Sequence, residues 1–233
     1  DKMVSDEQFA TRETRFPLNP PTTKEYYLLR EIFEEHFVTG MENGDCAYAT
    51  CPFGKSIACS TPEAVDDDLR WLVALVSDTG MRLAEGAGLL KTDIILDADI
   101  PYISLKPHLW RPLKTTGSQR DIPLVGASLW AAQRLSESFL DSPYAFPRYN
   151  RKETTNSNSA SAALNKWLHQ YVPEGCTMHS FRHSMRDRLR AVECPSDVID
   201  QIGGWATEGV GQGYGEGYEL KVCAKWMRLV AQK

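Results

Sequence analysis

Two segments of the sequence carry side chains that could act together on a phosphate group. Residues 79–82 read Thr-Gly-Met-Arg, so Arg82 follows a glycine that should end a helix and is presented at a turn. Alone, this segment favours the ordinary interpretation, a surface arginine paired with Glu85 one turn on. His179 and Arg182 are three residues apart and would share one helix face, where they could hold an anion through forked hydrogen bonds or simply form a capped, solvated helix start.

Two further segments offer a proton donor and a nucleophile. Lys114 precedes a turn predicted at 115–118 and could reach into a cleft from the mouth of a β-hairpin. Tyr214 lies nine residues after Trp205 in a glycine-rich stretch, where its hydroxyl could attack an electrophile. Each has an ordinary alternative. A lysine can simply protect a sheet edge, and a loop tyrosine can simply be exposed, with Tyr218 as a competing candidate.

The spacing of apolar residues predicts the elements that must position these groups. Apolar side chains at helical spacing mark helices, and short β-branched runs bounded by turns mark strands of a small antiparallel sheet. The predicted fold class is therefore mostly α with a small antiparallel β-sheet (α+β). We expect helices at 22–37, 60–79, from 83, 127–139, 160–171, 179–192, 196–202 and 219–231, strands at 93–98, 101–106 and 120–124, and a mobile polar connection at 148–159.

Composition and charge limit the class of protein. The net charge of −5 argues against a uniformly basic nucleic-acid binder, but the acidic residues cluster early and the stretch 182–190 is basic, which is compatible with a local DNA-facing surface. No apolar run is long enough to cross a bilayer. Cys46, Cys51 and Cys59 lack the paired spacing of zinc ligands, and six cysteines in this length indicate a reducing, cytoplasmic setting.

Together, the order and spacing of these residues resemble the tyrosine recombinase family, which includes phage and mobile-element integrases. That family has an arginine in a Thr-Gly-x-Arg turn, an acidic residue three positions on, a hairpin lysine, a His-x-x-Arg pair, a His or Trp, and a tyrosine nine residues later. The resemblance covers roughly residues 22–233 and implies the catalytic-domain fold of that family. The matching residues are Arg82, Glu85, Lys114, His179, Arg182, Trp205 and Tyr214.

The resemblance implies site-specific recombination or integration of double-stranded DNA through a 3′-phosphotyrosyl intermediate. Tyr214 would attack the scissile phosphate, and Arg82 and Arg182 would stabilise its pentacoordinate state. His179 would be the base, and Lys114 would be the general acid for the departing 5′-oxygen. The family implies no cofactor: neither ATP nor a metal ion would be needed.

The other matching residues would support this site. Trp205 stands where most integrases have histidine, and it can donate only through its indole N–H, so it would orient or stabilise rather than transfer protons. Glu85 and His183 would brace the site without touching the reacting atoms.

The family also implies partners and a domain organisation. Residues 1–21 would be a linker from a core-binding domain missing from this chain, 22–233 the catalytic domain and 39–59 an inserted irregular loop. The C-terminal helix within 219–233 would pack on its own domain or dock on a neighbour in a homotetramer on DNA. Two alternatives stay open: a type IB topoisomerase-like enzyme that relaxes DNA, and a non-catalytic DNA-binding relative.

Overall fold

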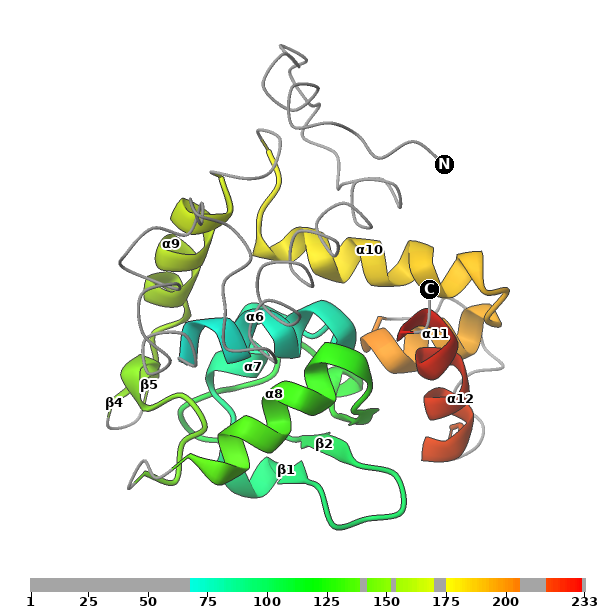
Figure 1. Cartoon of the computed structure of the whole chain (residues 1–233), viewed down its shortest axis with the longest axis horizontal. Helices are drawn as coiled ribbons and strands as arrows, with labels where there is room; N and C mark the ends of the chain where they lie inside the picture. Colours follow the sequence, from blue (N-terminus) through cyan, green and yellow to red (C-terminus); the bar gives the residue numbers. More distant parts are fainter. Residues whose placement is uncertain (1–67, 139–141, 152–153, 170–174, 206–216, 232–233) are drawn as a thin grey trace, which may run out of the picture.

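The computed structural model describes residues 68–138, 142–151, 154–169, 175–205 and 217–231, which form helices around a small sheet (Figure 1). The predicted class, mostly helical with a small antiparallel sheet, is confirmed. Several predictions lie outside the described residues: the linker at 1–21, the helix at 22–37, the loop at 39–59, the beginning of the helix predicted at 60–79, and Cys46, Cys51 and Cys59.

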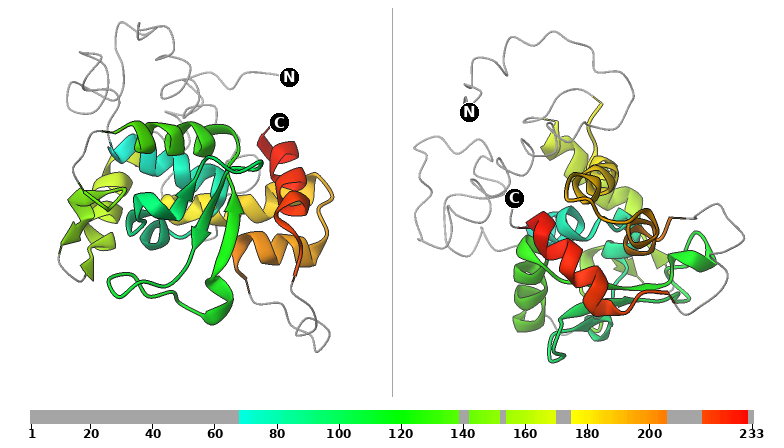
Figure 2. Two further views of the ribbon diagram at one scale, coloured as in Figure 1. Left: turned by 90° about the horizontal axis from the view of Figure 1, so that it is seen from below. Right: turned by 90° about the vertical axis from the view of Figure 1, so that its right-hand side faces the viewer.

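Helix α6 (Asp68–Thr79) is the centre of the described core. Every residue from Arg70 to Thr79 is buried, because α8 (Gly126–Glu137) and α10 (Met178–Ala191) both pack along it (Figure 2). A helix covered in this way is apolar around most of its circumference. It ends at the predicted position, directly before Gly80.

Three short strands form the predicted antiparallel sheet. They are β1 (Ile94–Ile95), β2 (Tyr102–Leu105) and β3 (Arg120–Pro123), and they pair in chain order. Ile103 of β2 lies between Ile94 and Ile122 of its two neighbours, and alternate residues of β2 face the core. The connection 106–119 between β2 and β3 ends in a 3-10 turn, η3 (Thr116–Ser118), where the sequence predicted a turn.

The prediction of a mobile polar connection at 148–159 is wrong. After η4 (Pro147–Tyr149), the strands β4 (Asn150–Arg151) and β5 (Thr154–Thr155) pair antiparallel, and α9 (Ser157–Leu168) begins directly after them. The buried amide of Asn150 donates to the carbonyl oxygens of Ala87 and Phe146 at 2.7 and 2.8 Å. Two-residue strands are too short for side-chain alternation to reveal them.

Helices α11 (Ser196–Gly203) and α12 (Leu220–Ala231) complete the fold beside β3 and α10 (Figure 2). The helix α12 rests on its own domain and buries Cys223, Ala224, Met227 and Val230, whereas Val222 and Trp226 of the predicted apolar side are only half-buried. Burial raises the pKa of the free Cys223 thiol to about 11. Among the described residues, no helix is long and apolar enough to cross a membrane.

Candidate active site

Arg82 is held at the turn between α6 and α7 (Leu83–Ala87). Gly80 in this turn has φ +62°, and a Cβ there would lie 2.9 Å from Cβ of Met185 on α10, so the turn requires glycine. The close approach of turn and helix lets Arg182 of α10 donate to the carbonyl oxygen of Gly80 at 2.8 Å. The Thr-Gly-Met-Arg turn therefore brings the two predicted arginines together.

Glu85 binds both the backbone and the side chain of Arg82. Its Oε2 accepts from the Arg82 amide at 2.9 Å, and its Oε1 accepts from Arg82 Nη1 at 2.6 Å. Burial raises the pKa of Glu85, but the charge of Arg120 and the hydrogen bonds and charge of Arg82 outweigh burial and lower it overall. Glu85 is therefore ionised at neutral pH, and its contacts support the predicted bracing role.

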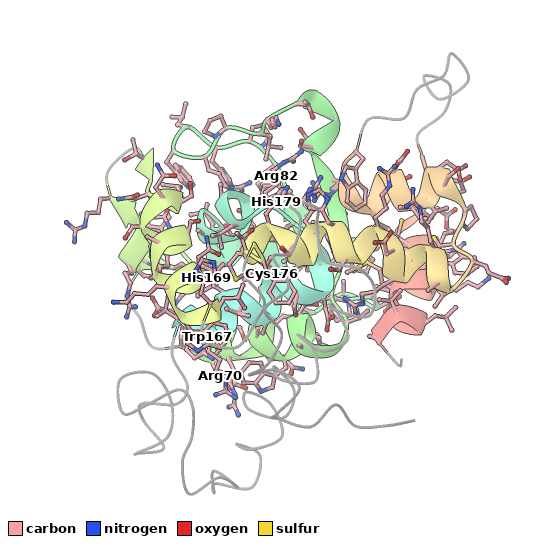
Figure 3. The ribbon with its side chains drawn as sticks, turned by 90° about the horizontal axis from the view of Figure 1, so that it is seen from above. Arg70, Arg82, Trp167, His169, Cys176 and His179 are labelled. Carbon is pink, nitrogen blue, oxygen red and sulfur yellow. The ribbon has the colours of Figure 1, made fainter. Side chains whose placement is uncertain are left out.

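His179 lies in the first turn of α10, next to Arg82 (Figure 3). Its ring meets the ring of His183 edge to face, with centroids 4.8 Å apart, as expected for residues one helical turn apart. Burial, the neighbouring His183 and the charge of Arg182, followed by those of Arg82 and Lys114, lower the pKa of His179. The imidazole is therefore neutral at neutral pH and free to accept a proton.

Trp205 follows α11 and lies against two arginines of α10. The guanidinium of Arg182 is 4.6 Å from the centroid of its ring, and that of Arg186 is 5.1 Å away. Both distances are within the range of cation–π attraction. A Cβ on Gly203 would lie 1.8 Å from the ring, so the glycine makes room for Trp205 in this position.

Of the two remaining predicted residues, Lys114 and Tyr214, the structure describes only Lys114. Lys114 is exposed on the 106–119 connection, close enough to His179 for its charge to lower the pKa of that histidine. Tyr214 lies outside the described residues, which resume at Gly217. Six of the eight predicted residues therefore lie close enough to interact, and they form one neighbourhood: Arg82, Glu85, His179, Arg182, His183 and Trp205. Lys114 lies at its edge, and Tyr214 is outside the described residues.

Three residues of this neighbourhood were missed in the sequence. Arg120, the first residue of β3, is buried and pairs with Glu85 at 3.3 Å, and Ser118 accepts from Arg82 Nη1 at 3.1 Å. Arg186 pairs with Asp200 at 2.5 Å beside Trp205. The sequence offers one signal for two of these residues. Ser118 ends the turn that follows Lys114, and Arg120 comes two residues later.

Positive charge exceeds negative charge at the centre of the site. Three guanidinium groups, those of Arg82, Arg120 and Arg182, surround the single carboxylate of Glu85. Burial and the charges of Arg82 and Arg120 lower the pKa of Arg182 to about 9. Among the described residues, Nη2 of Arg182 is buried without a hydrogen-bond partner. An anion would supply both the missing charge and the missing acceptor.

The interpretation of 182–190 as a DNA-facing basic surface is wrong in part. Arg188 is fully buried and pairs with Asp78 of α6 at 3.0 Å, so its charge faces the core and not a ligand. Arg182 is also buried, at the candidate site. Arg190 is exposed and pairs with Asp187 one turn away. Arg182, Arg186 and Arg190 are four residues apart and share one side of α10, whereas Arg188 points from another side into the core.

Tyr218, the competing candidate nucleophile, is bound to α11. Its hydroxyl donates to Asp197, and its amide and carbonyl are both bound by the Gln201 side chain at 2.7 Å. The hydrogen bond to Asp197 raises the pKa of Tyr218. A nucleophilic tyrosine needs the opposite shift, because the phenolate is the reactive form. This geometry argues against Tyr218 as the nucleophile.

Comparison with known proteins finds a short similarity to asparagine synthetases. The chain is 46% identical over 67 residues to asparagine synthetase B of Escherichia coli (strain K12), and 45% identical over 71 residues to asparagine synthetase 2 of Arabidopsis thaliana. These matches span 29% and 30% of this chain but only 11% of the length of each relative. Such a small share does not make the chain an asparagine synthetase.

The fold is similar to that of solved integrases. Variants of the Tn1549 transposon integrase, in complex with transposon right end DNA or with circular intermediate DNA, match with TM-scores of 0.51 and 0.50. Each match covers 87% of this chain at 16% sequence identity, and the chain spans 63% and 66% of those integrase chains. At this identity, the likeness establishes the catalytic-domain fold.

The family is established by a match to the sequence itself. The pattern of the Phage integrase family matches residues 57–216, which is well over half of the chain. The matched range contains the turn of Arg82, the 106–119 connection, the start of α10 and Trp205, and it extends past Tyr214. This chain belongs to the Phage integrase family.

Proposed function

We propose that this chain cleaves and rejoins double-stranded DNA at specific sites as a tyrosine recombinase. The observation that carries the proposal is the buried Nη2 of Arg182, which lacks a hydrogen-bond partner among the described residues, in a cluster of three arginines around one carboxylate. A phosphodiester is the anion that fits such a cluster, because guanidinium groups bind phosphate oxygens through paired hydrogen bonds.

In the proposed reaction, Oη of Tyr214 attacks the scissile phosphorus. The bond between phosphorus and the 5′-oxygen breaks, a bond between phosphorus and Oη forms, and a 5′-hydroxyl leaves. Attack by the 5′-hydroxyl of another strand reverses the step and joins new partners. One phosphodiester replaces another at each stage, so the exchange is nearly neutral in energy and needs no external energy source.

Arg82 and Arg182 are placed to stabilise the transition state. Both guanidinium groups are fixed before DNA arrives, Arg82 by Glu85 and Ser118, and Arg182 by the Gly80 carbonyl and the ring of Trp205. Donors that are already oriented stabilise developing charge without the cost of reorganisation. In this proposal, Trp205 acts by orienting Arg182.

His179 and Lys114 handle the protons in this proposal. The neutral imidazole of His179 accepts the proton of the attacking hydroxyl, which needs help because a free tyrosine has a pKa of about 10. Lys114 gives a proton to the departing 5′-oxygen, reaching it from the exposed connection. His183 adds to the field that keeps His179 neutral.

The assignment of His179 as the base predicts how the rate of adduct formation falls on the acidic side of the pH profile. If neutral His179 is the base, the rate of covalent adduct formation should fall only below pH 6.5, the ordinary value of histidine, because burial and the surrounding charges lower its pKa. In His183→Gln one of those charges is removed, so the limb should move to higher pH. Single-turnover rates measured across the acidic range check this, and a limb above pH 6.5 in the wild type would rule out His179 as the base.

A suicide substrate tests the proposed reaction. The full chain is incubated with a pool of short nicked duplexes of randomised sequence, at low salt, where phosphate contacts bind DNA most tightly. Cleavage releases a short strand beyond the nick, which prevents rejoining and traps the enzyme on the DNA. We expect an adduct that resists denaturation with the wild type and with Tyr218→Phe, and none with Tyr214→Phe. No adduct with any of the three would exclude the enzyme and leave the non-catalytic relative.

Sequences recovered from the adduct then separate the two enzymatic functions. A recombinase joins two copies of the recovered site, whereas a type IB topoisomerase-like enzyme relaxes a supercoiled plasmid without exchanging partners. We expect joined products from a plasmid with two sites. Relaxation alone would overturn the recombinase assignment while keeping the chemistry.

We also propose that four copies of the chain assemble on DNA through α12. In the described residues α12 packs on its own domain, but Leu229 on its outer side is 38% exposed and Trp226 is half-buried. These side chains could contact a neighbouring copy. Native mass spectrometry of the complex with the recovered site should show four chains, and a complex of one chain per site would contradict the assembly.

A further inference from the structure

Arg120 is one of the buried charged residues of the candidate site. Its side chain is 4% exposed, in the first position of β3, and it cannot reach a ligand at the surface. A buried guanidinium is costly unless its N–H groups are bound and its charge is paired. Arg120 meets both conditions, and its partners lie on segments far apart in the sequence.

Each partner of Arg120 belongs to a different part of the site. Its Nη2 pairs with Glu85 Oε2 at 3.3 Å, its Nη1 donates to the Ser118 carbonyl at 2.7 Å, and its Nε donates to the Ile202 carbonyl at 2.8 Å. These partners lie on α7, on the turn η3 and near the end of α11. One planar guanidinium therefore joins three elements.

Each of these three elements contains a predicted site residue or lies next to one in the chain. Glu85 binds Arg82, as described above. The Ser118 hydroxyl lies 2.9 Å from the Thr115 hydroxyl, directly beside Lys114 in the chain, and also accepts from Arg82. The contact with Ser118 therefore fixes the segment that bears the lysine.

The third element, α11, leads directly into the segment that bears Trp205. Ile202 lies three residues before Trp205, and Gly204 between them has φ +61°. A Cβ on Gly204 would lie 2.7 Å from Nη1 of Arg120, so the backbone rests directly on the guanidinium. The turn that presents Trp205 to Arg182 is therefore shaped around Arg120.

We infer that Arg120 is a positioning residue that holds Arg82, the Lys114 segment and Trp205 in one geometry for strand cleavage. Arg120 does not contact DNA in this role. It acts through Glu85, Ser118 and the end of α11. The inference rests on the proposed function, because it assigns Arg120 a part in that reaction.

Arg120→Lys is the sharpest variant. Lysine keeps the positive charge beside Glu85 but has one nitrogen in place of a planar fork, so it cannot serve three acceptors with the same geometry. Displacing reacting groups by about 1 Å costs about 100-fold in rate, so we expect the single-turnover rate constant at saturating DNA to fall about 10- to 100-fold. The DNA dissociation constant should stay within about twofold of the wild-type value, because the phosphate contacts remain.

The rate constant and the amplitude of adduct formation together distinguish a positioning role of Arg120 from a role in folding. A purely structural role would lower the amplitude of adduct formation, which counts folded molecules, and leave the rate constant of the remaining molecules unchanged. Arg134→Lys is the matched control, since Arg134 is an exposed arginine of α8 paired with Glu137. Ser118→Ala, which removes the hydroxyl contacts with Arg82 and Thr115, should slow the reaction in the same sense and remains informative if Arg120→Lys fails to fold.

Two results would overturn the inference. The first is a wild-type rate constant in both Arg120→Lys and Ser118→Ala. The second is a loss confined to DNA affinity, which would make Arg120 a binding residue. Both differ from failure of the proposed function, in which the wild type itself forms no adduct.

Discussion

Arg182→Lys should slow covalent adduct formation about 100-fold, even though the charge is kept. The substitution removes the forked guanidinium that binds the Gly80 carbonyl, lies against Trp205 and leaves Nη2 free for a phosphate oxygen. Loss of one oriented donor to a developing negative charge costs about 100- to 1000-fold in rate. Lysine should retain some of that stabilisation as a point charge. The expected loss in rate is therefore at the lower end of this range.

The measurement is the single-turnover rate at saturating DNA, with Arg190→Lys as the control. Arg190 lies on the same helix but is exposed and paired with Asp187, so its substitution should leave the rate unchanged. A rate for Arg182→Lys within a few-fold of the wild type would show that Arg182 does not contact the reacting phosphate.

Arg188→Met should destabilise the fold by about 3–5 kcal/mol, the usual cost of removing one partner of a buried ion pair. Arg188 and Asp78 are 1% and 2% exposed, and Nη2 of Arg188 donates to Asp78 at 3.0 Å. Arg188 also donates to the carbonyl oxygens of Ser77 on α6 and Val230 on α12. Removing it leaves the Asp78 charge in the core and loosens the contact between α10 and its neighbours.

A double-mutant cycle with urea unfolding checks this value. Asp78→Asn removes the buried charge while its side-chain oxygen can still accept from the amide of Ala127 at the start of α8. The double variant should therefore be more stable than Arg188→Met alone, with an unchanged dependence on urea concentration. If the two single losses simply add, the ion pair contributes no coupling and the account of this core is wrong.

Local patterns predicted most of the fold. Helical spacing of apolar side chains located α8–α12 and the described part of α6 to within a few residues, because each buries one face or more against a neighbour. β-branched runs located the three strands, because Ile103 and Ile122 must face the core. The β4–β5 hairpin was missed because its two-residue strands are held by the side chain of Asn150.

Long-range charge pairing could not be predicted. A buried arginine and a surface arginine look the same in sequence, so Arg188 was taken as part of a DNA-facing stretch. Its partner Asp78 is 110 residues away. Arg120 is the strand residue that the sequence predicts, but no nearby residue indicates that it joins Glu85, 35 residues away, to Ile202, 82 residues away. Such pairs are set by packing in three dimensions and leave no local periodicity.

The grouping of these site residues was expected from the resemblance to the tyrosine recombinase family, whose motifs keep them at short fixed spacings. Arg82 with Glu85, and His179 with Arg182, are each three residues apart, and each pair meets as such spacing requires. The Gly80 turn links the two pairs. The motif Thr-Gly-Met-Arg indicates this turn, but it does not show that the turn packs against Met185. Tyr214 stays a prediction from its position nine residues after Trp205.

Identification of the residue that carries the DNA tests the central claim most directly. The denatured adduct of the wild-type chain is digested with protease and nuclease, and the modified peptide is sequenced by mass spectrometry. We predict a nucleotide joined through its 3′-phosphate to Tyr214. A nucleotide on Tyr218 or on any other residue would contradict the account, as would a Tyr214→Phe variant that forms the adduct at the wild-type rate.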